Sequence, residues 1–156
     1  MCVGAYQHCF KHFSPYKCIN KKRKQRFNVQ FLATEGAIPV FMQLTESPDL
    51  DLKNQAFWYL ANTIGDTSVK LREIICCNGI TDVLKREFEK QETPPEALLS
   101  NLVWCICNLF RYKPSPRYET MRWIFPHLKK CLDCKDENLI GDTLWTMAYA
   151  RFFHIK

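Results

Sequence analysis

Three tryptophan blocks recur along the chain, and this repetition limits the possible fold more than any other feature. Each block has a polar residue three positions before its Trp and an Asn or Tyr four positions after it. The blocks run from Gln55 to Asn62, from Asn101 to Asn108 and from Asp142 to Tyr149, around Trp58, Trp104 and Trp145. The tryptophans are 46 and 41 positions apart, a period typical of solenoids built from two- or three-helix repeats.

Within each block the Trp and its two polar companions fall on one face of a helix. An apolar stripe is predicted on the opposite face. The predicted stripes are Ala56, Phe57, Leu60 and Ile64 in the first block, Leu99, Leu102, Ile106 and Leu109 in the second, and Ile140, Leu144 and Met147 in the third. Because stacked repeats align equivalent helices, the tryptophans should form a ladder with rungs about 10 Å apart.

The pattern is helical from Asn28 onward and predicts an all-α fold. We expect helices over about 38–46, 50–65, 67–77, 80–90, 96–112, 120–132 and 137–152. Two predicted helix starts have similar sequences, Gly36-Ala37-Ile38 and Gly79-Ile80. This second repetition supports a solenoid independently of the tryptophans.

The net charge of +6 is concentrated near the start of the chain, where Lys21 to Arg26 supply five positive charges. Residues 1–27 contain Cys and His, show no sustained helical period, and are interpreted as a basic tail. The remainder is close to neutral, which argues against nucleic acid as a partner. A nucleic-acid binder acting through the tail would show steep salt dependence that disappears when residues 21–26 are neutralised.

Metal, membrane and catalytic functions find little support in the sequence. No apolar run reaches the roughly 18 residues of a membrane span, and the nine cysteines are interpreted as reduced thiols. Cys131 and Cys134 have metal-ligand spacing without a second pair, and Cys105 and Cys107 are predicted to pack in the interior. The tail residues Cys2, His8, Cys9, His12 and Cys18 fit no familiar zinc spacing. We expect no cofactor, no metal and no enzymatic activity.

Residues 31–150 resemble the armadillo repeats of importin alpha (karyopherin alpha), the adaptor for nuclear localisation signals. The matching segments are Gly36 to Pro39, Asn54 to Asp66, Trp104 to Arg111, Ile124 to Leu128 and Asp142 to Tyr149. The resemblance implies a right-handed superhelical solenoid of about two and a half armadillo repeats within residues 28–156. Their expected limits are about 36–78, 79–118 and 119–156.

The resemblance also implies a groove for an extended peptide rich in Lys and Arg. Trp58, Trp104 and Trp145 would support the aliphatic stems of its basic side chains. Asn62 and Asn108 would hold its backbone, with Tyr149 replacing the third amide. Gln55, Asn101 and Asp142 would contact the peptide from the preceding turn. Asp66 would pair with its most buried lysine, the competing interpretation being a solvent-exposed carboxylate at a helix end.

Two departures from the family pattern affect the expected partners. The family's basic autoinhibitory segment, which recruits importin beta, is not found in full, so recruitment of importin beta stays open. Residues 1–27 contain no Trp, so the repeat expected before Gly36 lacks its block. The basic run at 21–26 has three competing interpretations: a solvated tail, a localisation signal, or a segment occupying the chain's own groove.

The resemblance implies a nuclear import adaptor acting between cytoplasm and nucleus, with basic localisation signals of cargo proteins as partners. One alternative is an armadillo scaffold for another extended peptide. A second is a truncated, non-functional relative. Trp123, which accompanies Ile124, Phe125 and Leu128, is expected in the core rather than in the groove.

Overall fold

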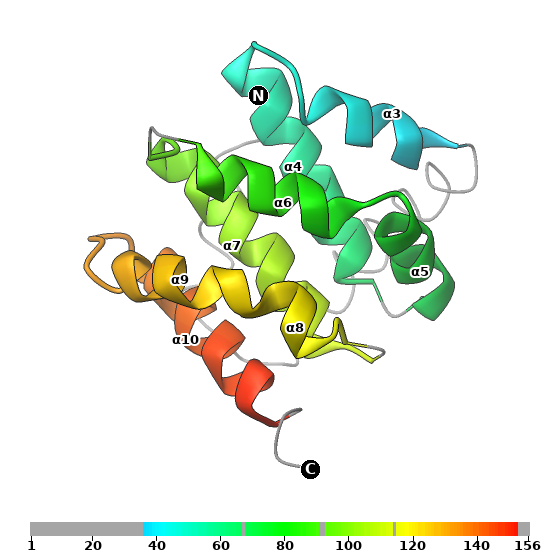
Figure 1. Cartoon of the computed structure of the whole chain (residues 1–156). Coiled ribbons are helices and arrows are strands. Elements are labelled where there is room, and N and C mark those ends of the chain that lie inside the picture. The colour runs from blue at the N-terminus through cyan, green and yellow to red at the C-terminus, as the bar shows by residue number, and fades with distance from the viewer. Residues whose placement is uncertain (1–35, 67, 91–92, 114, 153–156) are drawn as a thin grey trace, which may run out of the picture.

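The computed structural model describes residues 36–66, 68–90, 93–113 and 115–152 (Figure 1). Its regular structure within these ranges is helical: α3 (Ala37–Leu44), α4 (Leu50–Ile64), α5 (Val69–Cys77), α6 (Ile80–Glu89), α7 (Glu96–Arg111), α8 (Tyr118–Met121), the 3-10 turn η1 (Arg122–Ile124), α9 (Phe125–Cys131) and α10 (Glu137–Phe152). The all-α prediction is confirmed for this part of the chain. The tail, including the basic run and its Cys and His residues, lies outside the described ranges. No described helix is both long and apolar enough to cross a membrane.

The helix expected over 120–132 is instead divided into α8, η1 and α9. Pro126 stands in the first turn of α9. A proline has no N–H to donate to the carbonyl four residues earlier, so a continuous helix through this position would lose a hydrogen bond. The prediction of one helix here was wrong because Pro126 favours a new helix start.

Local signals explain where the other helices begin. The Asp49 carboxylate caps α4 by accepting from the backbone N–H of Asp51 at 2.9 Å and of Leu52 at 3.2 Å. Gly36 and Gly79 precede α3 and α6 with φ of 79° and 82°, a left-handed conformation that favours glycine. The similar sequences at these two junctions therefore adopt the same backbone turn.

The three helices that carry the tryptophan blocks pack in sequence order, α4 against α7 and α7 against α10. Figure 1 shows α3, α6 and α9 following one another along the molecule in the same order. Of these, α3 packs on α4 and α9 packs on α10, while α5 contacts both α4 and α6. One apolar cluster runs through all these helices. Its largest fully buried members include Phe57, Leu60, Ile64, Leu102, Ile106 and Phe110.

The apolar stripes predicted for the first two blocks are buried, but the stripe predicted for the third is wrong. Leu144 is 54% exposed, and Ile140 and Met147 are half-buried. The buried face of α10 consists of Leu139, Thr143, Thr146 and Ala150. Thr143 and Thr146 donate their hydroxyl protons to carbonyls of their own helix, each at 2.7 Å. A threonine satisfied in this way can occupy an interior position, which hides the buried face from a pattern based on apolar residues.

Trp123 packs against the core, as expected, although part of its ring stays accessible. It lies in η1 and contacts the rings of Phe88 and His127, with centroid separations of 5.8 Å and 6.3 Å. This fourth tryptophan therefore belongs to the packing between α6 and the η1–α9 segment, away from the tryptophan blocks.

Candidate functional site

The three repeated tryptophans differ in how much of each indole is accessible. Trp58 and Trp104 are half-buried and pack partly against the core, whereas Trp145 is 58% exposed. Trp145 stacks on Tyr149, one turn later on α10, with ring centroids 5.5 Å apart and planes 21° from parallel. Helix α10 thus presents an exposed indole stacked on the half-buried ring of Tyr149.

The asparagines of the second block connect helices. Asn108 is only 4% exposed, and its Nδ2 donates to the carbonyl of Ala61 on α4 at 3.0 Å. The Nδ2 of Asn101 donates to Oδ1 of Asn54 on α4 at 2.7 Å. The polar positions flanking Trp104 therefore hold α7 against α4, a structural role that the sequence interpretation missed. Their predicted contacts with a peptide stay predictions.

Gly65 makes the close approach of Asn108 possible. A Cβ added at Gly65 would lie 2.8 Å from Asn108 Nδ2 and 3.2 Å from the Ala61 carbonyl oxygen. Contacts that short do not occur without a shift of the neighbouring atoms. The glycine directly after the first tryptophan helix is visible in the sequence, but its contact with Asn108 is not.

Asp66 lies in the turn after α4 and is 3% exposed, so its interpretation as a solvent-exposed carboxylate is wrong. Its Oδ1 accepts from the backbone N–H of Ser68 at 2.9 Å. Arg72, also buried, donates to the backbone carbonyls of Asp66 and Lys113, and its guanidinium lies 5.1 Å from the centre of the Tyr112 ring. Asp66 thus belongs to a junction that joins the ends of α4 and α7.

The remaining predicted residues vary in exposure. Gln55 is exposed, and Asn62 is half-buried with its Nδ2 donating to the Trp58 carbonyl of the same helix at 2.8 Å. Asp142 is half-buried, and burial together with the nearby charge of Asp136 raises its pKa to about 6. The positive charge of Arg111 opposes this shift, so Arg111 stands within electrostatic reach of the third block.

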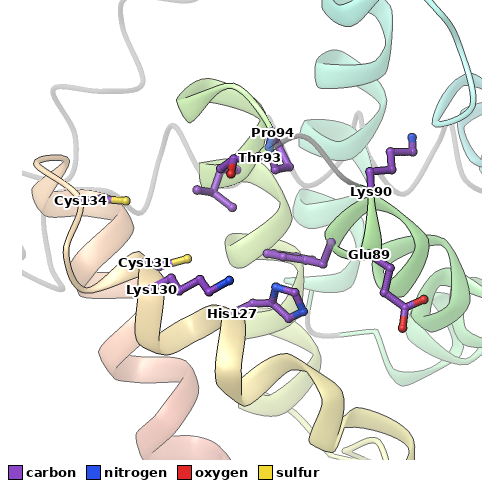
Figure 2. Close-up of a pocket in the computed structure, with 10 residues that line it drawn as sticks. Glu89, Lys90, Thr93, Pro94, His127, Lys130, Cys131 and Cys134 are labelled. Atoms are coloured by element: carbon purple, nitrogen blue, oxygen red, sulfur yellow. The ribbon is translucent and has the colours of Figure 1, made fainter.

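A separate hollow of about 420 Å³ lies between α6, the segment at Thr93 and Pro94, α7 and α9. Figure 2 shows Cys131, Cys134 and His127 beside it. It contains none of the ten predicted groove residues. The described residues include no group of three His, Cys, Asp or Glu side chains that could hold a metal ion. Burial raises the pKa of the Cys131 thiol to about 11, so this thiol is protonated at neutral pH.

The two cysteines of the second block are buried in the interior, as predicted. The Cys105 thiol donates to the carbonyl of Phe57 on α4 at 3.4 Å, which adds another link between α4 and α7. Burial raises the pKa of Cys107 to about 11. Both groups therefore act as packing side chains.

The order of the helices and a match to a known family together define an armadillo-repeat protein. Residues 28–63 match the family described as the armadillo/beta-catenin-like repeat. The match covers α3 and most of α4. It assigns the first tryptophan helix to a repeat of this type.

Importin alpha subunits are among the proteins similar to this chain. Importin subunit alpha-1b of Oryza sativa subsp. japonica is 30% identical over 122 residues, which make up 78% of this chain and 22% of that protein. Importin subunit alpha-5 of Arabidopsis thaliana is 34% identical over 102 residues, 65% of this chain and 19% of that protein. This chain is a divergent member of the importin alpha family, and it spans about a fifth of the length of these curated relatives.

Proposed function

We propose that the aligned faces of α4, α7 and α10 bind an extended peptide rich in Lys and Arg, as a nuclear import adaptor would. The observation that supports this proposal is that Trp58, Trp104 and Trp145 occupy the same position in their sequence blocks, on three helices that pack in order. Stacked repeats of a solenoid form an extended concave surface that suits an extended partner. Its action would be binding without chemistry, between cytoplasm and nucleus.

Aromatic faces supply the expected attraction. An indole attracts an ammonium or guanidinium group by about 0.5–2 kcal/mol, depending on how far the pair is removed from water. Because Trp145 is accessible and lies against Tyr149, a basic side chain has two aromatic rings within reach. Gln55 is exposed and its side-chain amide has both a donor and an acceptor for an extended backbone.

The charges near the ladder are mixed, which favours a modest affinity. Asp66 is buried in its turn, and Asp142 is partly neutralised near pH 6 by its raised pKa. Arg111 is exposed and near Asp142, so it would repel a basic peptide. The same features support the alternative of an armadillo scaffold for an extended peptide that need not be basic.

The test is fluorescence anisotropy with a labelled lysine-rich localisation-signal peptide titrated with the whole chain. A second peptide, with its central Lys replaced by Thr, measures the preference for charge. We expect the lysine peptide to bind more tightly, and Trp145→Ala to weaken its binding by about three- to thirtyfold, the loss of one cation–aromatic contact. Because Trp145 is mostly exposed, its replacement should leave the fold intact, which circular dichroism verifies.

Val40→Ala is the matched control because Val40 is also an exposed apolar residue, on α3 and outside the ladder. It should leave both affinities unchanged. Equal binding of the two peptides, with Trp145→Ala still harmful, would establish the scaffold for a neutral extended partner. Absence of binding to either peptide by the folded chain would overturn both readings.

Self-occupation of the groove by residues 21–26 is a further hypothesis, motivated by the position of this basic run before the first tryptophan block. Removing residues 1–27 should then strengthen the binding of the lysine peptide. Unchanged affinity would show that the basic run does not compete for the groove. Importin beta is a candidate second partner, to be tested by the same titration.

A further inference from the structure

Three equivalent positions differ sharply in their burial, and the difference marks an incomplete interface on α10. The residue directly before each Trp is Phe57 on α4, Val103 on α7 and Leu144 on α10. Phe57 and Val103 are fully buried, whereas Leu144 is largely exposed. Since the Cys105 thiol of α7 donates to the backbone carbonyl of Phe57, this residue of α4 lies beside the next tryptophan helix along the solenoid.

The neighbours of Leu144 on the same side of α10 are also partly accessible. Ile140 and Ala148 are half-buried, while the residues at the same register on α7, Leu99 and Cys107, are buried. These positions lie within about 40° of Leu144 around the helix, at 100° per residue. At these positions α10 is apolar, as α7 is, but its residues are more exposed than those of α7.

The complementary surface is at the opposite end of the molecule. Six positions before each Trp stand Leu52 on α4, Leu98 on α7 and Leu139 on α10. Leu98 and Leu139 are buried, and Leu52 is 49% exposed. This register lies on the side of α7 and α10 that faces the preceding helix. On α4 this register is exposed at Leu52 and Gln55, whereas Tyr59, the counterpart of Cys105, is 4% exposed and stacks on Phe41 of α3.

We propose that a second copy of this chain docks its α4 side, with Leu52, onto the α10 side of the first, with Leu144. The contact would continue the packing that joins α4 to α7 and α7 to α10. By register, Asn62 of the second copy would stand opposite the Ala148 carbonyl, as Asn108 stands opposite Ala61. The interface is head-to-tail, because each copy uses a different surface.

A head-to-tail contact has a decisive mutational signature. Leu52→Arg and Leu144→Arg each destroy one of the two surfaces, so each variant alone should stay monomeric. A mixture of the two should form a dimer and nothing larger, since one intact surface of each kind remains. We expect each arginine to weaken association at least about tenfold, because a charge would enter an apolar contact without a partner.

Sedimentation velocity over a wide range of protein concentration measures this. The unmodified chain should sediment faster as its concentration rises, and Val69→Arg, at an exposed apolar residue of α5, should do the same. Circular dichroism checks that each variant is folded. A chain that stays monomeric at every concentration would overturn the proposal. So would association that Leu144→Arg abolishes and Leu52→Arg does not, which indicates α10 pairing with α10. This readout is independent of peptide binding.

Discussion

Helices α7 and α10 carry the same Trp block in two different environments. In α7, Asn108 is buried because Gly65, directly after α4, leaves space for its amide. The residue of α7 in the register of Gly65 is Arg111, which is exposed. Tyr149, the counterpart of Asn108 on α10, is half-buried and lies against Trp145.

The comparison shows that one sequence pattern serves two purposes. A central helix is covered on both sides, so its polar flanking residues are used for contacts between repeats. A helix with one open side keeps its aromatic rings accessible. Binding variants are therefore best placed on α10, and stability variants on α4 and α7.

The largest difference in unfolding free energy between equivalent variants is expected at the position directly before the Trp. Phe57→Ala removes a fully buried ring and should lower the free energy of unfolding by about 3–5 kcal/mol. Leu144→Ala changes an exposed side chain and should lower it by about 0.5 kcal/mol or less at concentrations where the chain is monomeric. Chemical denaturation of both variants measures this contrast. Similar losses at the two positions would show that the α10 side is covered in solution.

The contact between Gly65 and Asn108 offers the next test. Gly65→Ala should lower the free energy of unfolding by about 1–3 kcal/mol because the new methyl group crowds the Asn108 amide. Asn108→Ala should cost about 1–2 kcal/mol through the lost hydrogen bond. The double variant should be at least about 1 kcal/mol more stable than the sum of the two single-variant losses predicts, since alanine at position 108 leaves room for the methyl group. Additive losses would mean that the two residues do not meet.

The pH dependence of stability should distinguish Asp142 from the surface carboxylates. The folded state raises its pKa from 3.8 to about 6, so the folded chain binds this proton more tightly than the unfolded chain. The stabilisation that comes from this tighter proton binding is fully present below about pH 4 and is lost as the pH rises through about 6. Asp142→Asn should therefore raise the free energy of unfolding by about 1–2 kcal/mol at neutral pH and by little in acid. Parallel stability profiles of the two proteins would contradict the burial of this carboxyl.

The smallest effect concerns Arg111 at the end of α7. Removing its charge with Arg111→Ala should strengthen binding of a lysine-rich peptide by about two- to fivefold at low salt, the range of an exposed charge interaction. Lys85→Ala on α6 is the control for net charge, because Lys85 is exposed and lies on a helix outside the ladder. Equal changes in the two variants would show a general charge effect, with no specific repulsion at the third block.

Much of the fold was predictable because its signals are local. Asp49, Gly36 and Gly79 fix helix starts through their own side-chain or backbone chemistry, and the apolar stripes of α4 and α7 follow the helical period. The stripe of α10 was mispredicted because Thr143 and Thr146 satisfy their hydroxyl groups within the helix. The break near Pro126 was legible in the sequence but was overlooked.

The sequence by itself determined the repeat, its period, the helices and the family to which the chain belongs, since each depends on residues close together in a block. Only the tertiary structure decided which polar residues face a neighbouring helix and which face solvent. The amide of Asn108 contacts a carbonyl 47 positions earlier, and Arg72 donates to a carbonyl 41 positions later. Such contacts depend on how helices approach one another, and that approach is set by the packing of whole side chains across repeats.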